Sequence, residues 1–507
     1  MATYLLAHDL GTTGDKATLF DRDGVLIASA FESYDTYYDQ PGWVEQDPEA
    51  WWSAVCRATA AVMSEAGIDK SSIAAISFSG HMMGCVPVDG EGNALRRAII
   101  WADQRAAEQV RSLLRAMPQE EIYRITGTRP NPNYTVEKLM WLRDNEPETY
   151  GKIRFVLQAK DYVVARLTGE FVTDYSDASA TNAFDLVRKE WSDEILAAAC
   201  LPKRLFPEAL PSTSIVGRVQ RFEGVDLEGV PVVIGGGDGA CATTGAGVIR
   251  ANEGYNYFGS SSWIAIATSE PVIDPGMRTF TLCHLAPDLY MPVGTMQSAG
   301  GSYDWIREVL FPEELGFSSD DAFDRLNRWA AASPPGAHGV VFLPYLIGER
   351  SPHWNENARG AFVGLARSHG VSDLVRAVLE GVAFNLRIIF DALTEQGARL
   401  QSLKMIGGGI RNPVLCQTLA DVLGIPIERV ERGEYATSLG AAVCAGVGVE
   451  LFDDFSVADS FSTVAGVDGP DPEAVEAYKC LAVLFGDAYE ALAPVFDRLA
   501  ELQSELG

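Results

Sequence analysis

The stretch LLAHDLGTTGDKATLFDRDG, residues 5–24, decides how the chain is interpreted. An apolar run ends on Asp9, the small residues Gly11-Thr12-Thr13-Gly14 follow Leu10, and a second apolar run begins after Lys16. One interpretation is an ordinary hairpin, whose turn needs glycine and small polar residues. The other is a phosphate site, because backbone amides exposed in such a turn can converge on a phosphate oxygen.

Bulk composition limits the classes of protein to consider. A chain of 507 residues is too long for one ordinary core, so we expect two or more domains. The net charge of -29 argues against binding to nucleic acid or to an anionic membrane. No cysteine pair has CxxC spacing, which argues against a zinc site. No signal peptide or long apolar run is present, so we predict a cytoplasmic protein.

Strand-like and helical segments alternate along the first half. Short apolar strands are predicted over four segments: 74–80, 96–103, 153–158 and 230–238. Between them lie helical patterns such as 48–67, with Pro48 at its start and Gly67 at its end. This alternation predicts an α/β fold with ligands at the carboxyl ends of the strands.

Similar strand and glycine-turn patterns occur in the second half of the chain. Residues 253–270 have the same strand, glycine–hydroxyl turn and strand as the opening stretch, and residues 229–247 and 402–426 share a strand–GGG–helix pattern. A weak internal duplication is therefore plausible, with a break near residues 247–252. Residues 472–504 form a long amphipathic helical pattern that Pro494 should kink.

Three glycine-rich turns follow predicted strands, at 11–14, 259–262 and 407–409. Hydroxyls in the first two turns add hydrogen-bond donors, and neither a P-loop nor a strand-linked G-x-G-x-x-G motif is present. Because the first two turns are alike and lie in separate halves, we expect two lobes that close on one nucleotide.

Two carboxylates stand beside these turns. Asp9 would bind a cation next to bound phosphates, or would merely cap its own turn. Asp238 follows three glycines at the predicted start of a helix, so it is either an N-cap or a base that accepts a hydroxyl proton during phosphoryl transfer.

Two further segments offer the surfaces that a sugar needs. SGHMMG (79–84) places His81 and Met82 between glycines, and WADQR (101–105) offers Trp101 as an apolar platform with Asp103 as a polar partner. Taken singly, a histidine like His81 and a tryptophan like Trp101 are more often ordinary core residues than sugar contacts.

Together these segments resemble the FGGY family of carbohydrate kinases, and within it the xylulokinase branch. The resemblance extends over nearly the whole chain in order, through HDLGTTGDK, SGHMMG, WADQR, EKLMWLRDN (137–145), AKDYVVARLTGEFVTDYSDAS (159–179), GGGDGA, FGSSSW, SAGGSYDW (298–305), PYLIGERSPHW (344–354), GAFVGLARSHGVSDLVRAVLE (360–380) and GGGIRNP.

The resemblance implies two actin-like (ribonuclease H-like) ATPase lobes with a deep cleft between them. The first lobe would span 1–249 and the second 250–470, and 471–507 would be a helix packing back on the lobes. ATP and Mg²⁺ are the implied cofactors. The implied roles are Asp238 as general base, Asp9 as magnesium ligand, phosphate contacts from Gly11, Thr12, Thr13, Lys16, Gly259 and Ser260, adenosine contacts from Gly300, Gly408, Gly409 and Asn412, and sugar contacts from His81, Met82, Trp101, Asp103 and Asp238.

The implied activity is transfer of the γ-phosphate of ATP to a xylulose-like pentulose. This chain has Met83 and Gly239 where xylulokinases usually have His and Asn, so another ketose such as ribulose, or an erythritol-like polyol, is an alternative. The rival classes are an actin-like ATPase without a sugar acceptor and a sugar sensor without turnover. The expected partners are the sugar and ATP, and a homodimer is left open.

Overall fold

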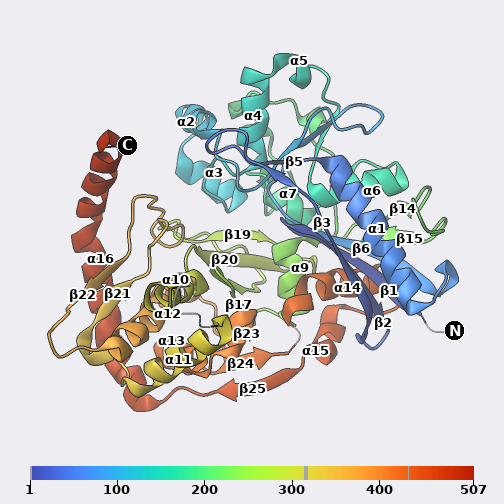
Figure 1. Cartoon of the computed structure of the whole chain (residues 1–507). Helices are drawn as coiled ribbons and strands as arrows, with labels where there is room; N and C mark the ends of the chain where they lie inside the picture. Colours follow the sequence, from blue (N-terminus) through green and yellow to red (C-terminus); the bar gives the residue numbers. More distant parts are fainter. Residues whose placement is uncertain (1–2, 313–317, 432, 507) are drawn as a thin grey trace.

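The computed structural model describes residues 3–312, 318–431 and 433–506. Two seven-stranded sheets organise the molecule, one in each half of the chain, with helices between and around them (Figure 1).

The first sheet has the order β14-β15-β6-β1-β2-β3, and β16 also pairs with β6. Its strands are β1 (Tyr4–Leu10), β2 (Gly14–Asp21), β3 (Leu26–Ser33), β6 (Ile73–Gly80), β14 (Ile215–Arg218), β15 (Pro231–Val233) and β16 (Gly236–Gly237). β1 is antiparallel to β2 and parallel to β6, in a register that sets Asp9 opposite Ser79. The opening stretch is therefore a hairpin whose turn lies at the carboxyl end of the sheet's central strand.

The second sheet has the order β19-β20-β18-β17-β23-β24-β25. Its strands are β17 (Gly254–Phe258), β18 (Ser262–Ile266), β19 (Phe280–Cys283), β20 (Tyr290–Met296), β23 (Leu403–Ile406), β24 (Ile427–Val430) and β25 (Val464–Asp468). The hairpin β17–β18 and the parallel neighbour β23 repeat the arrangement of β1, β2 and β6. Three central strands thus have the same order and the same relative directions in both sheets, as an internal duplication predicts.

Smaller sheets and single helices complete the first half. The short strand pairs and triplets are β4 (Thr36–Tyr37), β5 (Glu45–Gln46) and β8 (Ala98–Ile99), β7 (Val86–Val88) and β9 (Phe155–Leu157), β10 (Val172–Asp174) and β13 (Glu208–Leu210), and β11 (Phe184–Asp185) and β12 (Glu190–Trp191). The helices are α1 (Pro48–Ala66), α2 (Ala107–Ala116), α3 (Gln119–Thr126), α4 (Thr135–Asn145), α5 (Pro147–Tyr150), α6 (Ala159–Thr168), α7 (Tyr175–Ser179), α8 (Asp193–Ala198) and α9 (Asp238–Gly245).

The limits of α1 follow from its sequence. Asp47 accepts a hydrogen bond from the Glu49 amide at the N-terminus, Pro48 occupies the first turn, and Gly67 ends the helix in the left-handed conformation. The strand predicted over 96–103 is only two residues long, because the chain turns at Ile100, whose carbonyl accepts the Asp103 amide.

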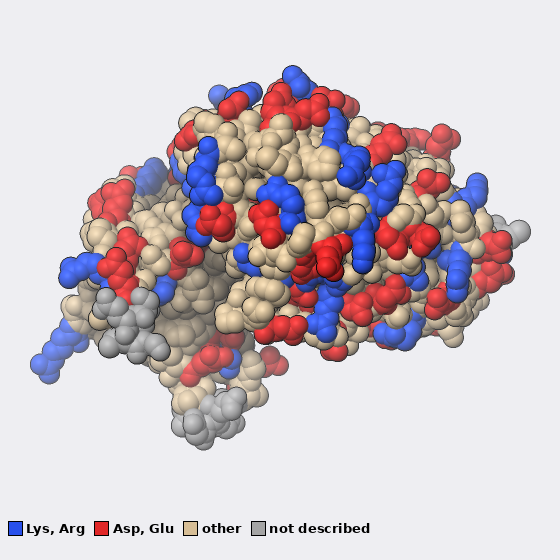
Figure 2. Space-filling view, turned by 90° about the horizontal axis from the view of Figure 1, so that it is seen from above, with Lys and Arg blue, Asp and Glu red and all other residues tan. Residues whose placement is uncertain are grey.

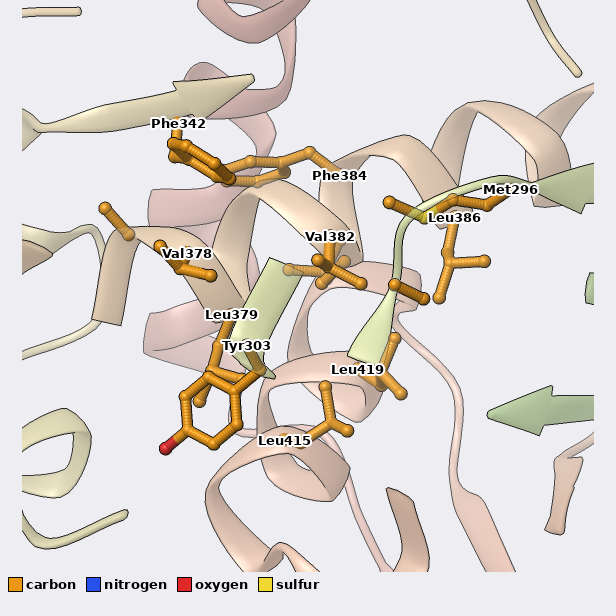
Figure 3. Packing of buried hydrophobic residues seen from close by; sticks show 14 of the residues in the cluster. Met296, Tyr303, Phe342, Val378, Leu379, Val382, Phe384, Leu386, Leu415 and Leu419 are labelled. Atoms are coloured by element: carbon orange, nitrogen blue, oxygen red, sulfur yellow. The ribbon is translucent and has the colours of Figure 1, made fainter. Parts of the chain in front are cut away.

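Further helices belong to the second half of the chain. They are α10 (Gly300–Leu310), α11 (Ser319–Ala332), α12 (Val371–Thr394), α13 (Pro413–Leu423), α14 (Ala436–Gly448), α15 (Ala458–Phe461) and α16 (Pro472–Leu506), with a further strand pair β21 (Val341–Leu343) and β22 (Ala361–Val363). Figure 3 shows side chains of α12, α13 and β20 meeting in the core of this half. α16 packs against α12, α13 and β21, and it runs as one helix through Pro494.

Helices α9 and α14 lie between the two sheets (Figure 1). They approach so closely that a Cβ on Gly440 would lie 1.9 Å from the Cys241 carbonyl oxygen, and a Cβ on Gly245 would lie 1.9 Å from that of Ala436. α14 belongs to the second half by sequence, yet it packs on β1, β6 and α9 of the first. The two halves therefore meet through glycine contacts between two helices.

Acidic and basic side chains are interspersed over the face seen in Figure 2. Within the described part of the chain, none of the helices is long and apolar enough to cross a membrane.

Candidate active site

Asp9 is held by two hydroxyl groups from different elements. Ser79 at the end of β6 donates to Oδ1 at 3.0 Å, and Thr437 in the first turn of α14 donates to Oδ2 at 2.6 Å. Burial raises the pKa of the Asp9 carboxyl, and these two hydrogen bonds and the charge of Lys16 oppose that rise. The carboxylate is therefore fixed by a neighbouring strand and by helix α14, and among the described residues no turn amide donates to its side chain.

The first glycine turn is closed by its own backbone and is tied to the WADQR segment. The Gly11 amide donates to the Gly14 carbonyl at 3.0 Å. Trp101 Nε1 donates to the Thr12 hydroxyl at 2.9 Å, and Gln46 donates to the Thr12 carbonyl at 2.6 Å. The Thr13 side chain is exposed beside them. The expected phosphate and sugar segments are thus adjacent.

Lys16 joins the two halves. Its ammonium donates to the Glu434 carbonyl at 3.1 Å and lies 5.4 Å from the centre of the Tyr435 ring. A cation at this place, next to the first turn, can attract phosphate oxygens.

Asp238 is the first residue of α9, and its Oδ1 accepts the amide hydrogen of Gly239 at 2.7 Å. Burial, and next the charge of Asp9, raise the pKa of Asp238 to about 7. Met82 covers the preceding turn so closely that a Cβ on Gly237 would lie 2.5 Å from its terminal methyl. The charge of Asp9, near the end of β1, thus acts on the carboxyl of Asp238 at the start of α9.

The glycine turns of the second half converge on one strand end. The Gly300 amide donates to the Gly259 carbonyl at 3.0 Å, and the amides of Ala299 and Gly301 donate to the Ser260 carbonyl, each at 2.9 Å. A side chain at Gly300 is impossible here, because its Cβ would lie 2.4 Å from that Gly259 oxygen. The Ser260 side chain itself is exposed.

The third turn packs on the same strand end. Gly408 is exposed, whereas Gly409 is buried against the ring of Phe258. Asn412 caps α13 by accepting the amides of Val414 and Leu415 at 3.1 Å. The structure therefore brings together the turns at 259–262 and 407–409 and Gly300, but the backbone of Gly409 and the side-chain oxygen of Asn412 already have structural contacts.

Family models match most of the chain. The N-terminal domain model of the FGGY family of carbohydrate kinases matches residues 4–245, and its C-terminal domain model matches residues 254–449. The chain belongs to the FGGY family of carbohydrate kinases. The family resemblance, the carbohydrate-kinase activity and the two actin-like lobes that the sequence predicts are thereby confirmed.

Individual members of the family are also similar to this chain in sequence and in structure. This FGGY kinase is 34% identical to a xylulose kinase of Escherichia coli K12 over 497 residues, which cover 96% of this chain and 99% of the relative. Its structure resembles a gluconate kinase from Lactobacillus acidophilus with a TM-score of 0.92, 28% identity and coverage of 98% and 100%. It also resembles a xylulose kinase from Rhodospirillum rubrum with a TM-score of 0.90, 30% identity and coverage of 97% and 100%.

In this FGGY kinase His81 is a buried, neutral side chain. It is 2% exposed, and its ring packs edge-on against Trp51 at 5.3 Å between centres. Burial lowers its pKa to about 4, and neither ring nitrogen has a hydrogen-bond partner within the described residues. The neighbouring Met83 has a φ of 64° and its carbonyl accepts the Lys138 ammonium at 2.7 Å. An unpartnered imidazole of this kind can accept or donate one hydrogen bond to a ligand.

Asp103 differs from the expected open polar partner of a sugar. It is fully buried, and its oxygens accept hydrogen bonds from Arg105 and from the Val44 amide. The Arg105 guanidinium lies 3.8 Å from the centre of the Trp43 ring and 5.0 Å from that of Trp141, which fixes the pair. Contact between Asp103 and a sugar stays a prediction.

Sequence reasoning missed Ser79 and Thr437 as partners of Asp9. Ser79 could have been found, because a parallel register of the first two core strands sets it opposite Asp9. Nothing local marks Thr437, whose role depends on α14 reaching the first sheet.

The donor set fits a magnesium ion that arrives with phosphates. No group of three or more His, Cys, Asp or Glu side chains able to hold a metal occurs among the described residues. Instead, the pKa values of both Asp9 and Asp238 are raised, and a cation beside these carboxyls would favour their ionised forms. Such an ion keeps several waters and needs only one or two carboxylates.

Proposed function

We propose that the protein transfers the γ-phosphate of ATP to a hydroxyl of a pentulose, with xylulose as the first candidate. The observation that carries this proposal is Asp238 at the start of α9, electrostatically coupled to Asp9 beside the glycine turn. The xylulose kinases among its relatives support the choice of acceptor.

The residues have distinct roles in this proposal. Asp238 accepts the proton of the sugar hydroxyl while that oxygen bonds to the γ-phosphorus and the bond from phosphorus to the bridging oxygen of ADP breaks. Asp9 would hold Mg²⁺, which neutralises charge on the phosphate oxygens. The turns at Gly11 and Gly259 offer backbone amides from opposite halves, and Lys16 adds a cation.

The proposed binding residues fall into two groups, one for the sugar and one for adenosine. Met82, Trp101 and His81 line the sugar side, with Asp103 behind them, and Gly300, Gly408, Gly409 and Asn412 form the adenosine side. We further propose lobes spanning 1–249 and 250–470, with 471–507 as an appended helix. A sugar bound between the lobes would favour closure and exclude water.

A second candidate acceptor is a sugar acid. The Arg350 guanidinium comes from the second half and lies 5.8 Å from the centre of the Trp101 ring. Burial lowers the pKa of Arg350, and the neighbouring Glu349 carboxylate only partly opposes this. A cation placed in this way favours an anionic ligand such as an aldonate, and a gluconate kinase is among the similar structures.

The test is ADP release with Mg·ATP across a panel of ketopentoses, ketohexoses, aldoses, polyols and aldonates. One acceptor with kcat of about 1–10³ s⁻¹ supports the kinase and names its substrate. Asp238→Asn should abolish transfer and retain ATP binding. Retained sugar phosphorylation in that variant would overturn the assigned base.

A further inference from the structure

A buried polar network lies behind the turn that carries Asp238. Lys160 of α6 is fully buried, and its ammonium contacts three carboxylates: Asp161 at 2.7 Å, Asp174 at 2.9 Å and Asp177 at 3.0 Å. Burial alone would lower the pKa of Lys160, but the three carboxylates outweigh it and hold that pKa well above its usual range. Breaking such a buried cluster is costly, so its geometry is rigid.

Asp174 connects this cluster to the turn. Ser176 Oγ donates to Asp174 Oδ2 at 2.6 Å, and the Ser212 hydroxyl donates to the same oxygen at 2.7 Å. Ser176 Oγ in turn accepts the amide hydrogen of Gly237 at 2.9 Å. A hydroxyl has one proton, so donation to Asp174 leaves its lone pairs directed to Gly237.

The turn before Asp238 packs against this network with no free space between them. A Cβ on Gly236 would lie 2.7 Å from Ser176 Oγ and 2.3 Å from the Leu285 side chain. On its other side, β16 pairs with β6, where Gly236 lies opposite Ser79 and Gly237 opposite Gly80. The backbone before Asp238 is thus fixed from two directions, and one of them includes a partner of Asp9.

We propose that Ser176, oriented by the Lys160–Asp174 pair, is a positioning residue that fixes the Gly237 peptide and thereby directs the Asp238 carboxylate toward the acceptor hydroxyl. This inference rests on the proposed function, because it takes Asp238 as the base. A misplacement of about 1 Å at a reacting group can reduce the rate by about 100-fold.

The test compares Ser176→Ala with Ser179→Ala. Ser179 lies in the same helix and is equally buried, and its hydroxyl donates to the Ser176 carbonyl at 2.7 Å and accepts the Cys283 amide at 3.0 Å. Each variant loses one buried hydroxyl, but only Ser176→Ala loses the contact with the Gly237 amide. We expect Ser176→Ala to lower kcat by about 10- to 100-fold with the KM for ATP nearly unchanged, and Ser179→Ala to retain kcat within about threefold at similar thermal stability.

A merely structural role would lower kcat equally in both variants, and that result would overturn the inference. Ser176→Cys keeps a weak donor and acceptor and should give an intermediate kcat, which supplies a second variant if Ser176→Ala does not fold.

Hydrogen exchange separates this inference from the proposed function. The Gly237 amide of the nucleotide-free protein should exchange faster in Ser176→Ala than in wild type or Ser179→Ala. This readout needs no substrate. If wild type phosphorylates no member of the panel, the proposed function fails, while faster exchange still supports the Ser176 contact. Unchanged exchange at Gly237 overturns the positioning role even in an active kinase.

Discussion

Thr437 donates a hydrogen bond of 2.6 Å to the carboxylate of Asp9, although 428 positions separate the two residues. The bond crosses from the second half of the chain to the first, because α14 packs on the sheet that carries Asp9. The proposed magnesium ligand is therefore oriented by a residue of the other half.

Replacing this hydroxyl should weaken the use of Mg·ATP. Thr437→Val keeps the shape of the side chain but removes a donor that favours the ionised Asp9 carboxylate. We expect kcat/KM for ATP to fall by about tenfold, with partial recovery at high Mg²⁺ concentration. Ser438→Ala is the matched control, because this neighbouring buried hydroxyl has no partner within the described residues. Equal losses in both variants would contradict a specific role for Thr437.

The rate of sugar phosphorylation should depend on pH through Asp238. Its pKa is raised to about 7 in the folded protein, so the fraction able to accept a proton increases as pH rises through this value. We expect kcat/KM for the sugar to rise with a midpoint near this pH, and the midpoint for kcat to be lower once a cation lies beside Asp9. A profile that is flat between about pH 5.5 and about pH 8.5 would contradict the prediction.

The same carboxyl should reduce stability at high pH. Because the folded pKa of Asp238 exceeds its unfolded value of 3.8, its contribution to stability is complete below that value and is lost as pH rises through about 7. Asp238→Asn keeps the oxygen that accepts the Gly239 amide, so in nucleotide-free protein it should be more stable than wild type above pH 7 by roughly 1–3 kcal/mol. Denaturant unfolding should show this difference vanishing near pH 4.

A control with the opposite sign is Asp89→Asn. Hydrogen bonds from Asn93 lower the pKa of Asp89, so this contribution is present above the unfolded pKa and is lost as pH falls. The variant should therefore not gain stability at pH 8. Equal pH dependence of the two variants would show that burial of Asp238 does not cause the effect.

Arg350 should distinguish acidic from neutral acceptors. Arg350→Gln removes the cation above Trp101 and keeps a polar side chain of moderate length. If an aldonate is the substrate, its kcat/KM should fall by about 100-fold or more, whereas that for a neutral ketose should change by less than about threefold. The panel assay of wild type and Arg350→Gln measures this directly. An equal loss of activity on all acceptors would contradict recognition of an acidic acceptor by Arg350.

The contact between α9 and α14 should tolerate no side chain. A Cβ on Gly440 would lie 1.9 Å from a carbonyl oxygen, so Gly440→Ala must separate the helices and should cost about 3 kcal/mol or more. Gly486→Ala in α16 is the control, since nothing lies within 4 Å of its Cβ position. That control should stabilise the helix by up to about 1 kcal/mol. Thermal unfolding of both variants tests the contrast.

Local signals predicted much of the fold. The run before Asp9 and the glycines after it predicted the hairpin, and Pro48 and Gly67 predicted the limits of α1, because these signals act within a few residues. The burial of Asp103 could not be predicted, because it depends on Arg105 lying between two distant tryptophans. The partner of Asp9 on α14 required knowledge of how the halves pack, which no local pattern contains.

The position of α14 has a consequence for synthesis of the chain. Apolar residues of β1 such as Leu5 and Ala7 are covered by the core that α14 completes. A ribosome makes the first sheet long before it makes α14, so the emerging first half has an uncovered apolar face until residues 436–448 leave the exit tunnel. The two lobes are consequently not separable products: a fragment ending between them would lack part of its own core and would be prone to aggregate.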